Sequence, residues 1–223
     1  MQNAYSLKIE KDVLFADLSD EEYLQFDQIG EKEVSQGEYI YFEAYRHPNI
    51  YFIRTGHIRL GYLDRQGNKI VKDILRPGDF FGQVTLQMEN LNGEFAQAYK
   101  TNATICSCTL DRFNQILASH PKLALKYSRI SGHRIRRSEE RLENILRNDV
   151  RTRLKLFLEQ RLDEVRDSAR WFGREVRIPN YLTHEDIAQL IGTSRQTVTS
   201  LLNSLKHENI CSYSRKELRF YNQ

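Results

Sequence analysis

Residues 182–205, with the sequence LTHEDIAQLIGTSRQTVTSLLNSL, restrict the fold of this 223-residue chain more than any other stretch. Two pairs of residues in it have the capping-box spacing of a helix start: Thr183 with Asp186, and Thr193 with Gln196. Gly192 lies between the two pairs and suits the left-handed residue just past a helix end. The stretch therefore predicts two short helices joined by a tight turn, a helix-turn-helix.

The small and apolar residues of this stretch fit two helices that cross closely. The apolar faces of the two helices are formed by Ile187, Leu190 and Ile191 in the first and by Val198, Leu201, Leu202 and Leu205 in the second. Ala188 lets the helix axes approach, Gly192 makes the turn, and the branched side chain of Val198 fills the angle between the helices. An ordinary helical hairpin without a nucleic-acid role is the alternative interpretation.

The exposed side of the second helix favours a DNA-binding role over that alternative. It carries short hydrogen-bonding groups and one arginine: Ser194, Arg195, Gln196, Thr197, Thr199, Ser200 and Asn203. Residues 194–206 contain no carboxylate. Such a surface suits base edges and phosphate groups.

The charges of the chain are divided unevenly. Residues 1–119 contain 12 Lys and Arg against 17 Asp and Glu, a net charge of −5, whereas residues 120–223 contain 21 against 13, a net charge of +8. The basic part is the part with the predicted helix-turn-helix. This division is expected if only that part meets a polyanion.

The first half of the chain has the pattern of an antiparallel β-roll. A short helix is expected over residues 17–29, after which the period of the apolar residues changes to two and glycines recur at turn-like intervals. We expect strands over residues 50–54, 57–63 and 69–75, with turns at residues 55–56, 64–67 and 76–79. Short strands without alternating helices predict a jelly roll (a double-stranded β-helix), and the whole chain is expected to be α+β.

A long helix follows the predicted roll. Residues 121–148 contain a single glycine and no proline after Pro121, and a helix of this length would measure about 40 Å. Its second half has a narrow seam at alternating spacings of three and four, flanked by charged residues. We expect this seam to form a dimer interface: Ile135, Ser138, Leu142 and Ile145. Packing of the helix on its own domain is the alternative.

The remaining segments complete the predicted organisation. We expect a break at Asn148 and Asp149, an amphipathic helix over about residues 150–162, and a loop with a short strand pair over 163–181. Residues 210–220 predict a hairpin with Arg215 and Lys216 at its tip, which makes the helix-turn-helix winged. The expected domains are a sensor over residues 1–120, a dimerisation helix over 121–148 and a DNA-binding domain over 149–223.

Three cysteines are too few for a disulfide framework. We expect Cys106 and Cys108 to lie in one strand with their side chains on opposite faces, which disfavours a shared metal, and we interpret all three cysteines as buried reduced thiols. The N-terminus is polar and no apolar run approaches the length of a membrane span, so we expect a cytoplasmic protein.

The order of β-roll, long helix and winged helix-turn-helix resembles the Crp/Fnr family of bacterial transcription regulators over nearly the whole chain. In the roll the resemblance rests on five segments: Gly37-Glu38, Tyr51-Phe52, Thr55-Gly56-His57-Ile58-Arg59-Leu60, Asp64 to Gly67, and Pro77-Gly78-Asp79-Phe80-Phe81-Gly82. In the helix-turn-helix it rests on Leu182-Thr183, Ile187-Ala188, Gly192, Ser194-Arg195, Thr197-Val198 and Leu205. The resemblance implies a homodimer on a palindromic operator, with each recognition helix in a major groove. RNA polymerase is a further partner if the regulator is an activator.

The sequence departs from the family members that bind cyclic AMP. Those members have Glu after the glycine of the phosphate loop and an Arg-Ser pair about ten residues later, whereas this chain has Gln83 and the segment Asn92-Gly93-Glu94-Phe95. A pocket without a cation and with Glu94 nearby would leave the cyclic phosphate unpaired. We therefore expect an effector other than cyclic AMP. The candidate effector pocket is formed by Phe81, Gly82, Gln83, Val84, Gly93, Glu94, Phe95 and Ser138.

No cofactor is expected. An iron–sulfur cluster of the Fnr type needs four thiolates near the N-terminus, and the chain has three cysteines, of which Cys106 is the first. Haem stays open as an alternative because four histidines could each supply a ligand: His47, His57, His120 and His133. We expect no bound metal.

The resemblance places base contacts at Arg195, Gln196 and Ser200, where many family members have Arg, Glu and Arg. Arg195 suits guanine and Gln196 suits adenine, so the operator is expected to differ from the common TGTGA half-site where Gln196 and Ser200 read it. The complete set of candidate DNA-binding residues is Thr183, Thr193, Ser194, Arg195, Gln196, Thr197, Thr199, Ser200, Asn203, Lys206, Arg215 and Lys216.

Two other classes of function fit the sequence less well. An effector-binding regulatory module without DNA binding would leave the acid-free helix surface and the basic second half unexplained. A cupin-like enzyme would need a cluster of metal ligands, but the next same-face positions after His57 are Arg59 and Gly61. We therefore expect no enzymatic activity.

Overall fold

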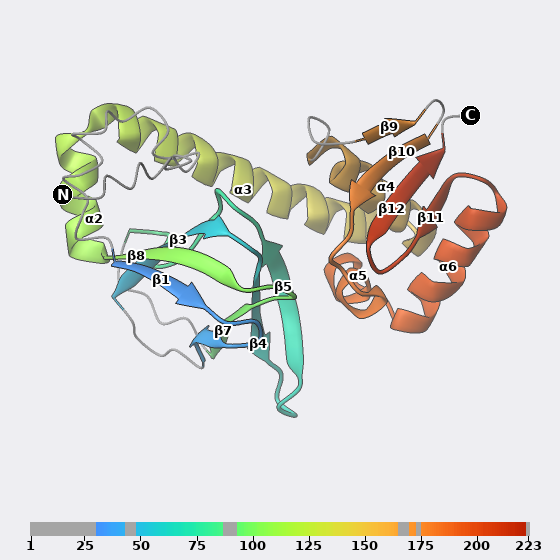
Figure 1. Cartoon of the computed structure of the whole chain (residues 1–223), viewed down its shortest axis with the longest axis horizontal. Coiled ribbons are helices and arrows are strands. Elements are labelled where there is room, and N and C mark those ends of the chain that lie inside the picture. Colours follow the sequence, from blue (N-terminus) through green and yellow to red (C-terminus); the bar gives the residue numbers. More distant parts are fainter. Residues whose placement is uncertain (1–29, 43–47, 87–92, 165–169, 173–174, 222–223) are drawn as a thin grey trace, which may run out of the picture. The chain divides into compact units, whose positions relative to one another are not determined.

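The computed structural model describes residues 30–42, 48–86, 93–164, 170–172 and 175–221. It divides into two compact units, Met1–His133 and Arg134–Gln223, and the boundary falls inside the long helix (Figure 1). The helix predicted over residues 17–29 lies outside the described residues.

The first unit is built on two four-stranded antiparallel sheets. In the order of their hydrogen-bonded neighbours, the strands of the first sheet are β1 (Gly30–Val34), β8 (Ala103–Thr109), β3 (Asn49–Thr55) and β6 (Phe80–Gly82). Those of the second sheet are β2 (Tyr39–Tyr41), β7 (Glu94–Ala98), β4 (Ile58–Leu63) and β5 (Lys69–Leu75). The three strands predicted within residues 50–75 are confirmed, as is the antiparallel roll.

Local turn chemistry explains why these strands reverse where they do. The Asp64 carboxylate accepts hydrogen bonds from the backbone N–H groups of Gln66 and Asn68, each at 2.8 Å, and closes the turn between β4 and β5. Gly56 has φ +77°, and a Cβ atom there would lie 2.4 Å from the carbonyl oxygen of Asn102. The turn between β3 and β4 therefore requires glycine.

The described residues of the first unit include two buried apolar clusters. One lies between the sheets and includes Ile58, Leu60 and Phe81. The other joins the first sheet to α2 (Leu110–Ser119) and to the first turns of α3 (Pro121–Arg147), through residues that include Phe113 and Tyr127. Burial of the large aromatic side chains of these clusters contributes to the stability of the unit.

The expectation that the Cys106 and Cys108 side chains lie on opposite faces of their strand is wrong. Both residues lie in the same cluster, against α2 and α3, because side chains two positions apart in a strand share a face. All three cysteines are buried and free. Burial raises the pKa of Cys108 and raises that of Cys211 to about 11, so both remain protonated thiols at neutral pH.

The second unit contains the end of α3 and a small helical domain with its own sheet. Its elements are α4 (Val150–Glu164), β9 (Arg170–Phe172), β10 (Glu175–Pro179), α5 (His184–Ile191), α6 (Arg195–His207), β11 (Cys211–Tyr213) and β12 (Glu217–Tyr221). The sheet is antiparallel in the order β11, β12, β10, β9. The break between α3 and α4 was predicted, and there the Asp149 carboxylate accepts the N–H of Thr152 at 2.8 Å.

Within the part of the chain that the structure describes, the helices are too short or too polar to cross a lipid bilayer.

Candidate nucleic-acid interface

The first helix of the predicted helix-turn-helix begins and ends as its sequence indicates. Thr183 precedes α5, its hydroxyl accepts the N–H of Asp186, and the Asp186 carboxylate accepts the N–H of Thr183 at 2.7 Å. This is the predicted capping box. Gly192 follows the helix with φ +69°, in the left-handed region. Both termini of α5 are therefore set by local chemistry.

The predicted capping box at the start of α6 is wrong by one residue. The backbone N–H of Thr193 donates to the carbonyl of Ala188 at 2.8 Å, so Thr193 still closes the end of α5. Ser194 is the residue that precedes α6, and its hydroxyl accepts the N–H of Thr197 at 3.1 Å. The capping role therefore belongs to Ser194, and the exposed Gln196 has no part in it.

The two helices cross as the small residues indicate. Ala188 on α5 and Val198 and Leu205 on α6 are almost fully buried, and Leu202 is buried with them. Leu201, which was predicted for the same face, is half-buried. Because the crossing is held by apolar contacts, the opposite side of α6 is free to be polar.

That polar side is where most of the candidate DNA-binding residues lie. Arg195, Gln196, Ser200, Asn203 and Lys206 are exposed on α6, and Ser194 is exposed just before it. Thr193, Thr197 and Thr199 are half-buried. The Ser194 and Thr197 hydroxyls lie 2.8 Å apart, and Thr183 and Thr199 also have hydrogen bonds inside the protein. Arg195, Gln196, Ser200 and Asn203 are thus the exposed candidates for base contacts on α6.

His184, the first residue of α5, connects this surface to α6 and to the hairpin. Its Nδ1 lies 2.8 Å from the Thr199 hydroxyl, and its ring lies edge-on to Tyr213 with the ring centres 4.8 Å apart. Burial, and secondarily the nearby Arg195 guanidinium, lowers the pKa of His184. The imidazole is therefore neutral at pH 7.

The predicted hairpin is confirmed as β11 and β12, with Arg215 and Lys216 exposed at its tip. The hairpin is held to the start of α5 by Asn180, which is buried. The Asn180 amide donates to the carbonyl of Ser214 at 2.6 Å, and its side-chain oxygen accepts the N–H of Leu182 at 3.0 Å. The Tyr213 hydroxyl also donates to the carbonyl of Leu182. These hydrogen bonds therefore fix the position of the hairpin relative to the helix-turn-helix.

Sequence reasoning missed three of these positioning residues. Asn180, two positions before Leu182, has the spacing at which an asparagine side chain bonds the backbone, and that signal was available. His184 and Arg151 gave no local signal. Arg151 on α4 donates to the Ser204 hydroxyl at 3.1 Å and to Glu208, which joins α4 to the end of α6. This contact lowers the pKa of Glu208.

The candidate effector residues of the roll do not all share one surface. Phe81, Gly82 and Gln83 are buried at and just after β6, and the carbonyl of Val84 accepts the Tyr127 hydroxyl. Glu94 and Phe95 are neighbours on β7 and so face opposite sides of the sheet. The Phe95 ring contacts Tyr39 and Phe42, with ring centres 5.9 and 6.3 Å away. Ser138 lies in the second unit and donates to the carbonyl of Arg134.

The expectation that no cation lies near Glu94 is wrong. Lys72 on β5 is 2.9 Å from Glu94 Oε2, and the Tyr41 hydroxyl donates to Glu94 Oε1 at 2.8 Å. The sequence has no arginine between Arg76 and Arg112, but Lys72 lies before that segment and reaches Glu94 from another strand of the same sheet. The Glu94 carboxylate is thus an internal anion that already has a cation as its partner.

The residues of the α3 seam are exposed in the single chain. Ile135 is 62% exposed, Leu142 57% and Ile145 42%, and Ser138 is also exposed. Leu146, next to the seam, is 76% exposed. These large apolar side chains form an exposed apolar strip along α3.

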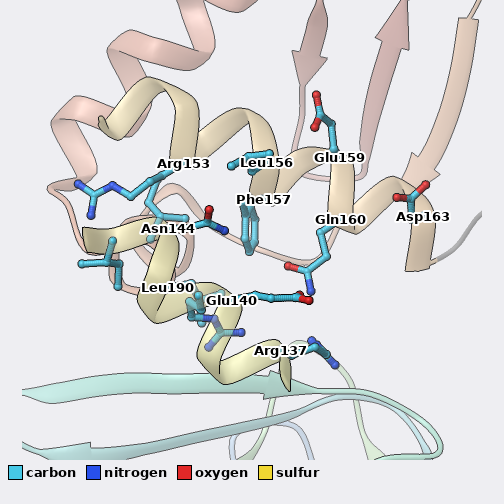
Figure 2. Close-up of a pocket in the computed structure, with 13 residues that line it drawn as sticks. Arg137, Glu140, Asn144, Arg153, Leu156, Phe157, Glu159, Gln160, Asp163 and Leu190 are labelled. Carbon is cyan, nitrogen blue, oxygen red and sulfur yellow. The ribbon is translucent and has the colours of Figure 1, made fainter. Parts of the chain in front are cut away.

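The second unit also contains an open cavity of about 290 Å³ between α3, α4 and α5 (Figure 2). Phe157 and Leu190 give it an apolar lining, whereas Arg137, Glu140 and Asp163 bring both signs of charge to it. Among the described residues, no three His, Cys, Asp or Glu side chains are grouped so that they could hold a metal. The mixed charges single out no class of ligand for the cavity.

A helix-turn-helix with a positioned hairpin and a polar, acid-free second helix defines a winged-helix DNA-binding protein. Comparisons with known proteins agree. The family model described as "Crp-like helix-turn-helix domain" matches residues 153–221, and that described as "Cyclic nucleotide-binding domain" matches residues 31–120. The chain belongs to the Crp/Fnr family, which consists of transcription regulators and not of enzymes.

Individual relatives agree with this assignment. A global nitrogen regulator of Synechocystis is 29% identical over 184 residues, which cover 82% of this chain and 80% of the relative. A cAMP-activated global transcriptional regulator, CRP, of Salmonella typhimurium is 24% identical over 172 residues, covering 77% and 80%. The solved structure of a CooA mutant from Carboxydothermus hydrogenoformans superposes on this chain with a TM-score of 0.72 at 22% sequence identity. The match covers 89% of this chain and 86% of that structure, and it supports the assignment of the fold.

Proposed function

We propose that this transcription regulator acts as a homodimer on a palindromic operator. The observation that carries the proposal is the exposed side of α6, where Arg195, Gln196, Ser200 and Asn203 stand on a helix that is rigidly capped and free of carboxylates from residue 194 to 206. The N-terminal residues of α6 contact base edges in the major groove, and the hairpin tip with Arg215 and Lys216 contacts the phosphate backbone. A cytoplasmic location follows from DNA as the partner.

The α3 seam supplies the dimer contact in this proposal. Two copies that meet along Ile135, Ser138, Leu142 and Ile145 bury apolar surface that is exposed in the single chain. A two-fold dimer presents two recognition helices, one for each half-site, so the operator mirrors the symmetry of the protein. Residues 1–120 act as the sensor, 121–148 as the dimerisation helix and 149–223 as the DNA-binding domain. RNA polymerase is a partner where the regulator activates transcription.

The effector in this proposal is not cyclic AMP. Gln83 is buried where a ribose-binding carboxylate is expected from the family resemblance, and Lys72 is paired with the internal carboxylate of Glu94. Lys72 and Glu94 lie 2.9 Å apart and neutralise each other, so a cyclic phosphate brought to this side of the sheet would have to compete with the Glu94 carboxylate for the lysine charge. An effector-binding module without DNA binding leaves the polar side of α6 without a role.

A salt titration tests the DNA-binding part of the proposal. Affinity for a duplex falls with salt because each neutralised phosphate releases counterions, with a logarithmic slope of about −0.9 for each phosphate contact. A dimer with 6–10 such contacts is expected to lose about 10³–10⁵-fold in affinity between 50 and 200 mM salt. Fluorescence anisotropy with a labelled duplex measures this directly. Absence of binding at 50 mM salt, or binding that does not depend on salt, contradicts the proposal.

A further inference from the structure

His184 occupies a place on the candidate DNA surface that its sequence does not indicate. It is the first residue of α5, directly after the capping Thr183, and it is half-buried against α6 and the hairpin. In helix-turn-helix complexes the first helix crosses the phosphate backbone while the second lies in the groove. Backbone N–H groups at a helix start also favour an anion. The imidazole therefore lies at the end of α5 where a phosphate group is expected.

The hydrogen bonds around Thr199 determine which nitrogen of His184 carries the proton. The Thr199 hydroxyl lies 2.9 Å from the carbonyl oxygen of Arg195, which can only accept a hydrogen bond. The single hydroxyl proton makes that bond, so the hydroxyl oxygen accepts from His184 Nδ1–H at 2.8 Å. Nε2 then keeps its lone pair and can take up a proton without breaking the bond to Thr199.

The groups that face His184 keep the ring neutral until an anion arrives. From α6, Arg195 repels a positive charge on the ring, and from β11 the neutral Tyr213 contacts its edge. On α5 itself, Glu185 is exposed and accepts the side-chain N–H of Gln189 at 3.0 Å, and Asp186 is buried in the capping box. A phosphate beside Nε2 would add the negative charge that stabilises the imidazolium.

We propose that His184 is a further DNA-contacting residue, whose Nε2 takes up a proton as it binds a backbone phosphate. This inference rests on the proposed DNA-binding function. The free protein holds a neutral imidazole and the complex holds a cation, so complex formation consumes one proton. Because the complex binds one more proton than the free protein, DNA affinity rises as pH falls. The rise is confined to the pH window between the lowered pKa of His184 in the free protein and its higher pKa in the complex. Outside that window His184 contributes no pH dependence. The largest slope is about tenfold in affinity for each pH unit.

The test compares the pH dependence of DNA affinity in wild type and His184→Gln, measured by anisotropy with one labelled duplex at constant ionic strength between pH 5.5 and 8. Glutamine keeps an amide donor for Thr199 but does not titrate. Wild type is expected to gain up to about tenfold more affinity for each unit of acidification than His184→Gln. His207→Gln, which changes an exposed histidine at the end of α6, is the matched control and should retain the wild-type pH dependence.

A second variant keeps the result interpretable if glutamine disturbs the fold. His184→Lys carries a permanent charge, so its affinity should be independent of pH relative to His184→Gln, with a salt slope steeper than that of His184→Gln by about 0.9 at every pH. In wild type the salt slope should steepen by up to that amount on acidification. Equal pH slopes for wild type and His184→Gln would overturn the inference while leaving DNA binding intact. Absence of DNA binding by wild type at every pH would instead overturn the proposed function, and this inference with it.

Discussion

Replacing Leu142 with aspartate is expected to convert the dimer to a monomer and to weaken binding to a two-half-site operator by about 10²–10⁴-fold. Leu142 stands at the centre of the α3 seam and is 57% exposed in the single chain, so the change leaves the fold of the subunit intact. In the dimer it would place two carboxylates, one from each subunit, in an apolar contact, where a buried charge without a partner is strongly unfavourable. The second half-site would then have to be bound by a separate molecule.

Sedimentation of the variant gives the oligomeric state, and anisotropy gives the affinity. The matched control is Arg136→Gln, which changes the charge of the same helix by the same amount but lies off the seam. Arg136 makes an exposed ion pair with Glu140, of the kind that contributes little to stability. The control is expected to remain a dimer with operator affinity within about twofold of wild type. A dimeric Leu142→Asp variant, or one that binds the operator as wild type does, contradicts the role of the seam.

Replacing Arg195 with alanine is expected to cost about 1–3 kcal/mol of binding free energy on the preferred operator and to relax the preference at one base of each half-site. Arg195 is the first residue of α6, and it is exposed beside the capping Ser194. Its guanidinium can donate two parallel hydrogen bonds to guanine O6 and N7, a contact that the wrong base cannot offer. The loss should therefore be larger on the operator than on scrambled DNA.

The Lys206→Ala variant shows how the loss of a phosphate contact differs from the loss of a base contact. Lys206 is exposed in the last turn of the same helix, away from the N-terminal residues that we propose to enter the groove. Its loss should weaken operator and scrambled duplexes alike and reduce the salt slope by about one. If Arg195→Ala also weakens the two duplexes equally, Arg195 contacts phosphate and does not read a base.

The features that were predicted from sequence depend on residues close together in the chain. The capping box of Thr183 and Asp186, the left-handed Gly192 and the turn at Asp64 are all decided within five positions, so their side chains indicate the structure directly. The start of α6 was misplaced because Thr193 and Ser194 are adjacent hydroxyl residues with the same capping chemistry. The bond from Thr193 to Ala188, which ends α5, decides between them, and it depends on where the first helix stops.

The features that were missed depend on contacts across the fold. Glu94 and Lys72 are 22 positions apart and meet because β7, β4 and β5 are neighbours in one sheet. Asn180 reaches Ser214 across 34 positions, and His184 reaches Thr199 across 15. No local pattern encodes such pairings, because they are set by strand order and helix crossing. The wrong prediction for the Cys106 and Cys108 side chains has a different cause. Strand geometry alone places side chains two positions apart on the same face of the sheet, so the sequence was sufficient to predict it.

Selection of bound sequences from a random duplex pool, with purified full-length protein in the absence and presence of cyclic AMP, tests the central claim most directly. A dimeric reader whose effector is not cyclic AMP should enrich one two-fold symmetric site equally in both arms, with half-site centres about one helical turn apart. That site should differ from TGTGA at the bases read by Gln196 and Ser200. Enrichment only with cyclic AMP, or enrichment of a site without two-fold symmetry, would contradict the account.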